Sequence, residues 1–271
     1  HVTHIIRGDD HLTNAFRQVH IYHACGWDVP IFAHIPLIHG SDGAKLSKRH
    51  GALGTEAYRD MGFLPEAMCN YLIRLGWSHG DDEIMSREQI IQWFDTDAIG
   101  KSPARLDLAK LTHINAHYLR ETNNQRLLDL SREFLTTNLS RPLTLIEETR
   151  LLRGMNGLKQ RAKTLIELAD AAMFYCVLPQ LDDKAIKFTT PEAKALIQTV
   201  INSIESSTDF TESPLESLVR QIAEQNNQKL GNIAQPLRVA LTGSTISPSV
   251  FEIMEVLEKE ETLNRLKAFI T

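Results

Sequence analysis

The stretch His4-Ile5-Ile6-Arg7-Gly8-Asp9-Asp10-His11-Leu12 is a short apolar run that leads into a cluster of charged residues. A second apolar run follows at residues 31–38, where Pro36 indicates that the run does not end in a central ladder position. Between the runs, the spacing of three and four residues predicts a one-sided helix that is stopped by Gly26, with a face formed by Leu12, Phe16, Val19 and His23. A strand, a helix and a strand in this order predict a βαβ unit with parallel strands.

From residue 60 onward, the apolar residues follow a helical period almost throughout. Residues 65–75 are predicted to form a helix that is ended by Gly76, with one face made of Ala67, Tyr71, Leu72 and Leu75. Further helix starts are predicted at the capping box of residues 86–89 and at the pairs Thr190-Pro191 and Ser213-Pro214. The polar stretch 182–190 is the best boundary within this part, so we expect an α/β part followed by an all-α part.

Composition excludes several classes of protein. The chain has 271 residues, of which 42% are hydrophobic, and its 29 Lys and Arg against 34 Asp and Glu give a net charge of −5. This hydrophobicity argues against disorder, and no apolar run approaches the roughly 20 residues that cross a bilayer. The three cysteines form no C-x-x-C pair, which argues against a disulfide framework or a cysteine-based zinc site. We expect a cytoplasmic protein without a membrane segment.

Two polar loops follow the two predicted strands. The first contains Arg7 and Asp10, and the second carries Lys45, Lys48 and Arg49 between glycines. Because ligands bind beyond the carboxyl ends of parallel strands, both loops lie where a ligand is expected. Cations on a glycine-flanked loop suit a triphosphate, since they stabilise the charge that builds up on a departing pyrophosphate. The alternative is a solvated basic turn, which a short motif of this kind matches by chance.

Several segments in the same order resemble one family. They are the stretch 4–12, Pro36-Leu37-Ile38, the KMSKS-like sequence Lys45-Leu-Ser-Lys-Arg49, the segments 62–76 and 115–120, and Leu230-Gly231 with 235–243. Together they resemble the class I aminoacyl-tRNA synthetases, and among these the glutamyl-tRNA synthetases of the bacterial type. The resemblance implies the second half of a Rossmann catalytic domain over residues 1–55, a stem-contact region over 56–124, and a helical anticodon-binding domain over 125–271.

The resemblance also implies roles for single residues. Lys48 would bind the ATP phosphates and stabilise the transition state, with assistance from Lys45 and Ser47 as the loop closes. The ATP site would further include Asp10, Leu37, Ile38 and Arg49, with Leu37 and Ile38 receiving the adenine through their backbone. Arg7 matches an arginine of the glutamate subsite, where a planar guanidinium suits a carboxylate. An ion pair at the end of a strand is the alternative explanation for Arg7 and Asp10.

The family pattern is incomplete at the front of the chain. A class I synthetase also carries an H-x-G-H signature in the first half of its Rossmann fold, and this sequence has none. We therefore expect the chain to be the carboxyl-terminal portion of a longer synthetase and to be inactive by itself. Two parallel strands cannot bury both faces of a sheet, so the first fifty residues should be poorly stable in isolation.

The expected reaction is the attachment of glutamate to tRNA-Glu with ATP and Mg²⁺, by a monomer that holds no zinc in this segment. Whether tRNA-Gln is also charged stays open. A glutaminyl-tRNA synthetase would share the catalytic signature, but the helical tail argues against its β-barrel anticodon domain. Two different functions stay open as well: a tRNA-binding module without chemistry, and a class I nucleotidyltransferase, which would leave the long helical tail unexplained.

Overall fold

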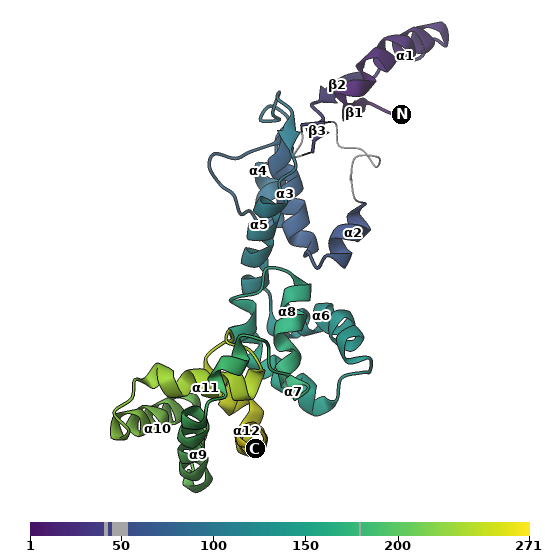
Figure 1. Cartoon of the computed structure of the whole chain (residues 1–271). Helices are drawn as coiled ribbons and strands as arrows, with labels where there is room; N and C mark the ends of the chain where they lie inside the picture. The colour runs from purple at the N-terminus through teal and green to yellow at the C-terminus, as the bar shows by residue number, and fades with distance from the viewer. Residues whose placement is uncertain (41–42, 45–53, 179) are drawn as a thin grey trace. The chain divides into compact units, whose positions relative to one another are not determined.

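The computed structural model describes residues 1–40, 43–44, 54–178 and 180–271 of the chain (Figure 1). It divides into two compact units, His1–Tyr118 and Leu119–Thr271, which are described separately below. The elements that begin in the first unit are β1 (His4–Gly8), the 3-10 turn η1 (Asp9–His11), α1 (Leu12–Ala24), β2 (Ile31–Ile35), β3 (Ile38–His39), α2 (Thr55–Asp60), α3 (Pro65–Gly76), α4 (Arg87–Trp93), β4 (Ala104–Arg105) and α5 (Leu108–Glu121).

The predicted βαβ unit is confirmed. Strands β1 and β2 pair in parallel, with Arg7 opposite His34 and Gly8 opposite Ile35, and α1 connects them. Gly26 follows α1 with a φ of +65°, a conformation that favours glycine. The second apolar run is divided, however, because β2 ends at Ile35, before Pro36, which has no N–H to donate. The next residues form β3, which pairs in parallel with β4 through Ile38 and Ala104.

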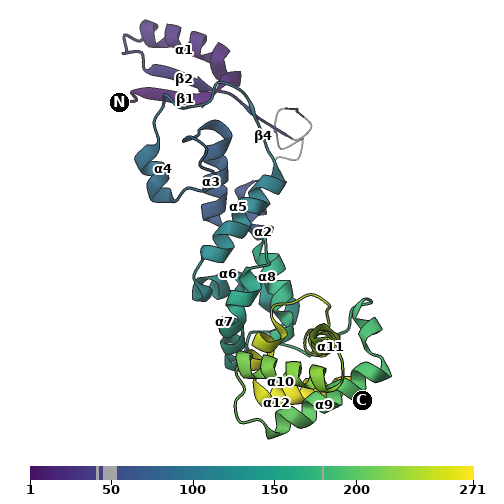
Figure 2. The ribbon, with the colours of Figure 1, turned by 90° about the vertical axis from the view of Figure 1, so that its left-hand side faces the viewer.

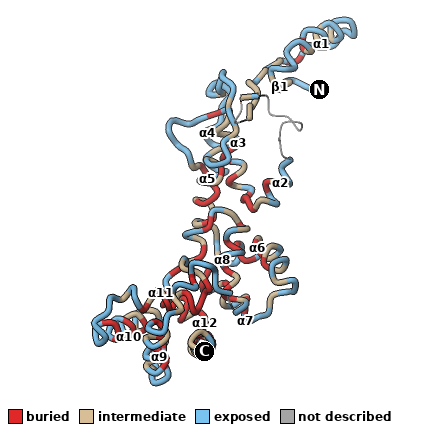
Figure 3. The backbone as a smooth tube through the Cα atoms, viewed as in Figure 1, coloured by how far each residue is buried: buried red, intermediate tan, exposed pale blue. Residues whose placement is uncertain are grey.

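The predicted apolar faces of two helices are only partly buried. Phe16 of α1 is 66% exposed, and Leu12 is also exposed, so the one-sided pattern is present without a partner that covers it among the described residues. In α3, Ala67 and Tyr71 are buried as predicted, but Leu72 is 44% exposed. Figure 3 shows the same contrast along the backbone, with α1 mostly exposed and the buried segments of this unit in and around α3 and α5.

A buried amide organises the core of the first unit. Asn70 of α3 is fully buried, and its side chain donates to the carbonyl of Glu83 at 2.9 Å and accepts from the N–H of Met85 at 2.9 Å. The hydroxyl of Tyr118 lies 2.9 Å from the Asn70 carbonyl oxygen. Asn115 of α5 likewise accepts from the N–H of Leu64 at 2.7 Å. These hydrogen bonds join α3, α5 and the segment 83–85. They also supply the partners that buried polar groups need.

The second unit is helical in all of its described elements (Figure 2). Its helices are α6 (Asn124–Leu139), α7 (Leu145–Lys159), α8 (Leu165–Ala172), α9 (Pro191–Ser206), α10 (Glu212–Gln225), α11 (Leu230–Thr242) and α12 (Val250–Ile270), with 3-10 turns η3 (Met173–Tyr175) and η4 (Ala185–Phe188). The core contains fully buried aliphatic side chains from most of these helices, including Leu127, Leu151, Val200, Leu237 and Leu257. No helix in the described part of the chain is long and apolar enough to cross a membrane.

Two of the three predicted helix starts are confirmed. Ser86 and Gln89 form the capping box of α4, and the Thr190 side chain accepts from the N–H of Ala193 at the start of α9. The third prediction is wrong by two residues, because α10 begins at Glu212 after Thr211. Pro214 therefore lies within the first turn, where the N–H that a proline lacks would have no helical partner in any case.

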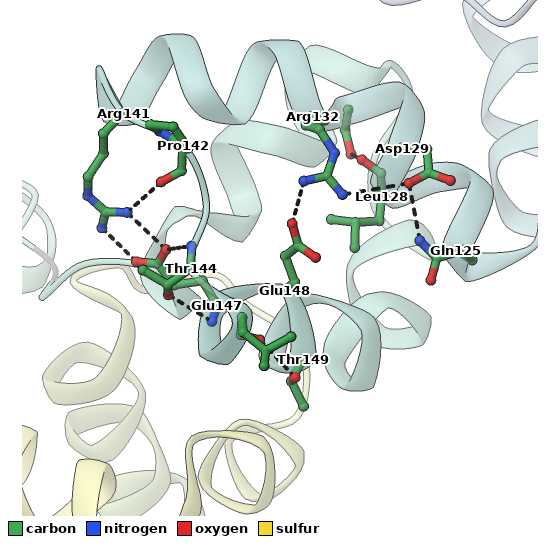
Figure 4. Close-up of polar contacts among 12 residues, drawn as sticks. Gln125, Leu128, Asp129, Arg132, Arg141, Pro142, Thr144, Glu147, Glu148 and Thr149 are labelled. Carbon is green, nitrogen blue, oxygen red and sulfur yellow. Dashed lines mark hydrogen bonds and ion pairs between the residues drawn. The ribbon is translucent and has the colours of Figure 1, made fainter.

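One ion pair joins α6 to α7, and a second joins the loop between them to α7 (Figure 4). Arg132 of α6 bonds the carboxylate of Glu148, and Arg141 donates two hydrogen bonds to Glu147, at 2.6 and 2.9 Å. Glu147 also accepts from the N–H of Thr144, the residue that caps α7. The hydrogen bonds from Arg141 lower the pKa of Glu147 to about 2, so this buried carboxylate is charged at neutral pH.

Helix α12 is interrupted at Glu258, which has φ +67° and ψ 166°. Its carboxylate accepts from Arg153 of α7 at 2.8 Å. This backbone region is used almost only by glycine, so Glu258 is strained.

Candidate functional site

The first candidate site lies at the carboxyl end of β1 and β2. The Arg7 guanidinium lies over the ring of Phe32, 5.4 Å from its centroid, and Arg7 is half-buried. Two of its donors, Nε and Nη2, are buried and have no hydrogen-bond partner in the described part of the chain. These two nitrogens lie along one edge of the guanidinium, in the spacing that matches the two oxygens of a carboxylate.

His34 accompanies Arg7 in this position. The two residues are register partners on β1 and β2, so their side chains leave the same face of the pair. His34 Nε2 is also buried and unpartnered among the described residues. No sequence pattern singles out His34, since a lone histidine in a strand carries no motif. Its position beside Arg7 could have been found by aligning the ends of the two predicted strands.

Asp10 and Leu37 come together above Gly8. A methyl group placed on Gly8 would lie 2.7 Å from Asp10 Oδ1 and 3.2 Å from Leu37 Cδ2. The missing side chain of Gly8 therefore makes room for Asp10, which lies on the η1 turn directly after β1. Asp10 Oδ2 is 3.9 Å from His11 Nε2, a contact between two partly exposed side chains. The structure thus brings together two of the residues assigned to the ATP site by resemblance.

Ile38 lies farther along, in β3. It lines an apolar cavity of about 340 Å³ with Ile6, Ile35 and Trp77. The cationic loop begins just beyond β3, where Gly43 adopts a φ of +80° and donates its N–H to the carbonyl of Gly40 at 3.0 Å. The remaining predicted site residues lie outside the described residues: Lys45, Ser47, Lys48 and Arg49.

The second candidate site is an open cavity of about 640 Å³ in the second unit. Its walls come from the α7–α8 connection, from η3 and from the loop between α11 and α12. The two charged residues among its described lining are Arg161 and Asp170, and apolar contributions come from Phe174 and Pro248. Arg161 is exposed and forms no ion pair with any residue that the structure describes. A cation beside an aromatic ring and aliphatic walls suits a planar, electron-rich group.

The cavity offers no reactive nucleophile among the described residues. Cys176 lies next to the lining residue Val177, but burial raises the pKa of its thiol to about 12, so it stays protonated at neutral pH. Within the described ranges, no three His, Cys, Asp or Glu side chains are placed to hold a metal ion. The sequence patterns did not reveal this cavity, because its walls come from segments far apart in the chain.

Two family models match this chain, one within each of the two units. The family model for the catalytic domain of class I tRNA synthetases (E and Q) matches residues 1–113, and that for an anticodon binding domain matches residues 126–270. Glutamate–tRNA ligase 2 of Paramagnetospirillum magneticum is 56% identical over 269 residues, which cover 98% of this chain and 56% of that protein. Glutamate–tRNA ligase 2 of Rhodospirillum centenum is 57% identical over 267 residues, with coverage of 98% and 57%.

A solved structure gives the same result. The crystal structure of a glutamate tRNA ligase from Elizabethkingia meningosepticum, in complex with its amino acid, superposes with a TM-score of 0.85 at 31% identity. The match covers 99% of this chain and 57% of that one. This chain therefore spans 56–57% of the length of these three relatives. Because matched regions extend over almost all of its length, the chain belongs to the class I tRNA synthetases of the glutamate and glutamine type.

Proposed function

We propose that this chain supplies part of the active site and the anticodon-binding part of a glutamate–tRNA ligase. The observation that carries the proposal is the buried, unpartnered edge of Arg7, which fits a carboxylate of the amino acid. In this proposal, residues 1–55 are the second half of a Rossmann catalytic domain. Residues 56–124 contact the tRNA stem, and residues 125–271 bind the anticodon arm.

The proposed chemistry proceeds in two transfers. The glutamate α-carboxylate attacks the α-phosphate of ATP, which forms glutamyl-adenylate and releases pyrophosphate. A ribose hydroxyl at the 3′ end of the tRNA then takes the glutamyl group and releases AMP. Lys48, with Lys45 and Ser47, would stabilise the charge that develops on the phosphates, and Mg²⁺ would enter with ATP. These groups act by position and charge, so no nucleophilic side chain is required.

The other proposed ATP contacts come from residues that follow β1 and β2 in the chain. Asp10 lies beside Leu37 above Gly8 and would face the nucleotide, while Leu37 and Ile38 would receive the adenine through their backbone. Arg49 would bind the phosphates together with Lys48. Arg7, with two unpartnered donors, would hold a glutamate carboxylate and fix its orientation.

The cavity of the second unit is the proposed place for a base of the anticodon loop. It lies within the region matched by the anticodon binding domain, and its lining combines Arg161 with Phe174. Stacking on an aromatic ring holds a base of any kind, and a guanidinium recognises the acceptors on its edge.

The proposal is tested with this chain and a second polypeptide that carries the H-x-G-H half of a relative. We expect the pair to catalyse glutamate-dependent exchange of pyrophosphate into ATP, and we expect Lys48→Ala to abolish it. Exchange that survives Lys48→Ala would contradict the role of that lysine. Charging assays with tRNA-Glu and tRNA-Gln would then show which tRNA is the substrate.

A tRNA-binding module without chemistry is the second candidate. The cavity of the second unit is the observation that favours this candidate. All of the described residues that line the cavity belong to the second unit, so this cavity could bind RNA without the first unit. This candidate predicts that the chain binds tRNA but that no exchange appears when the complementary half is added, so the same two assays separate the two functions.

A further inference from the structure

A smaller cavity of about 290 Å³ lies in the second unit, and it is called the α9–α12 cavity below. Its walls come from α9, α11, α12 and the segment that leads into α9. Two cationic residues line it, Lys194 of α9 and Arg265 of α12, whereas its described lining contains no aspartate or glutamate. Leu178 is the one described residue that it shares with the lining of the cavity of about 640 Å³. The α9–α12 cavity is therefore a separate feature of the helical unit.

Arg265 brings a buried cation to this cavity. The residue is only 2% exposed, and its Nε donates to Glu261 at 2.7 Å. Its Nη1 donates to the carbonyls of Phe174 and Leu241, at 2.6 and 2.9 Å. The other terminal nitrogen, Nη2, forms no hydrogen bond with any residue that the structure describes. Because a guanidinium keeps its charge and all of its donors at neutral pH, Nη2 can donate to a ligand in the cavity.

The Lys194 ammonium adds a second cation. Lys194 is half-buried, and its Nζ donates to the carbonyl of Ile270 near the end of α12, at 3.2 Å. This bond uses one of the three donors of the ammonium group. Within the described ranges, Lys194 forms no ion pair. Two of its donors are thus left for water or for a ligand.

The carboxylates around the cavity do not balance these charges. Glu261 is shared between Arg265, at 2.7 Å, and Arg150 of α7, at 3.9 Å. Burial lowers the pKa of Arg265, and the charge of Arg150 acts in the same direction. Of the ion pairs that the structure describes, only those with Glu261 involve Arg150, Arg265 or Lys194. A cavity lined by one sign of charge attracts ions of the opposite sign, so this one favours an anion.

We propose that the α9–α12 cavity binds a small free oxyanion of the size and charge of inorganic phosphate. Its oxygens would accept charge-assisted hydrogen bonds from Nη2 of Arg265 and from Nζ of Lys194. A phosphate of an RNA backbone has the same chemistry. Arg265 is only 2% exposed, however, and a small ion can reach such a group where a polymer chain cannot. This inference does not depend on the proposed function, because no step of the ligase reaction involves this cavity.

The test titrates the full chain with inorganic phosphate by calorimetry, in a chloride buffer of constant ionic strength. In one pair of variants, Ala268→Asp places a carboxylate at an exposed position of the lining, and Ala268→Asn is its neutral control of similar shape. In the other pair, Lys194→Met removes the ammonium group. Its matched control is Lys159→Met, because Lys159 also donates to one backbone carbonyl, that of Thr122, and lies outside the described lining.

We expect the parent chain to bind phosphate saturably at a single site. Lys194→Met should raise the Kd by about tenfold, the effect of losing one hydrogen bond from a charged donor. Ala268→Asp should raise it at least as much, since a carboxylate at this position repels the anion. Ala268→Asn and Lys159→Met should keep the Kd within about twofold of the parent value.

A parent chain that shows no saturable binding would overturn the proposal, and so would equal Kd values for Ala268→Asp and Ala268→Asn. If Lys194→Met does not fold, the Ala268 pair decides, because position 268 is exposed. The titration is then repeated with an excess of an RNA hairpin that carries the anticodon loop of tRNA-Glu. An unchanged Kd for phosphate supports a site for a free ion. A hairpin that displaces phosphate from the parent chain would contradict it, because an RNA phosphate would then be the occupant.

Discussion

The interruption of α12 at Glu258 leads to a prediction with an unusual sign. In a regular helix, glycine is about 1 kcal/mol less favourable than alanine. At Glu258, however, φ is +67° and ψ is 166°, a region in which a residue other than glycine stores about 1–3 kcal/mol. Glu258→Gly should remove this strain, at an entropic cost of about 0.4–1 kcal/mol in the unfolded chain.

The ion pair of Glu258 must be separated from the strain. Its carboxylate accepts from Arg153 at 2.8 Å, but the Glu258 side chain is 71% exposed, so the pair contributes about 0–1 kcal/mol. Glu258→Ala loses the same pair and keeps the strain, which makes it the matched control. Glu258→Gly should therefore be more stable than Glu258→Ala by about 1–2 kcal/mol.

The two units can be followed separately in the assay. All three tryptophans, Trp27, Trp77 and Trp93, lie in the first unit, so tryptophan fluorescence reports that unit. The change at Glu258 should shift the melting transition seen by far-UV circular dichroism, by about 2–4 °C per kcal/mol, without shifting the fluorescence transition. An alanine variant as stable as the glycine variant would refute the assignment of strain to Glu258.

Three further predictions concern stability and substrate binding. Because the pKa of Glu147 is lowered to about 2 from 4.5, its charge contributes stability above pH 4.5 that is lost as the pH falls toward 2. Glu147→Gln should thus cost about 2 kcal/mol at neutral pH, and urea titrations should show the difference shrinking over that range. Tyr175→Phe should leave stability unchanged or raise it by up to about 1 kcal/mol in thermal melts, since the buried hydroxyl has no partner among the described residues. Arg7→Met should raise the KM for glutamate in the exchange assay and leave that for ATP unchanged, and an equal rise in both would contradict the glutamate subsite.

Local sequence patterns predicted the helices and strands of this chain better than they predicted which side chains are buried. The parallel pairing of β1 and β2 and the caps at Ser86 and Thr190 follow from residues that are neighbours in sequence. Periodicity also placed the apolar face of α1, but it cannot show whether another element covers that face, and Phe16 is 66% exposed. The interruption at Glu258 was not predicted either, because no glycine or proline marks it in the sequence.

The candidate sites show the same limit. Resemblance selected Arg7, Asp10 and Leu37, and the structure brings Asp10 and Leu37 together over Gly8. The cavity of the second unit was missed, since its lining residues Arg161 and Pro248 come from segments that are far apart in the chain. A site built from distant segments leaves no local spacing to detect.

Residues that carry the family resemblance need not carry its chemistry, and hydrogen bonding separates the two cases. Asn70 and Asn115 lie in matched segments, yet their side chains are fully buried and bond backbone groups of other segments, so their role is to hold the first unit together. Arg7 lies in a matched segment as well, but two of its buried donors have no partner in the described chain. Each unpaired buried donor costs about 1–3 kcal/mol, and among the described residues Arg74 and Trp77 also carry such donors. The assignment of Arg7 to substrate binding stays a prediction, in which a bound carboxylate would supply the partner that these two donors lack among the described residues.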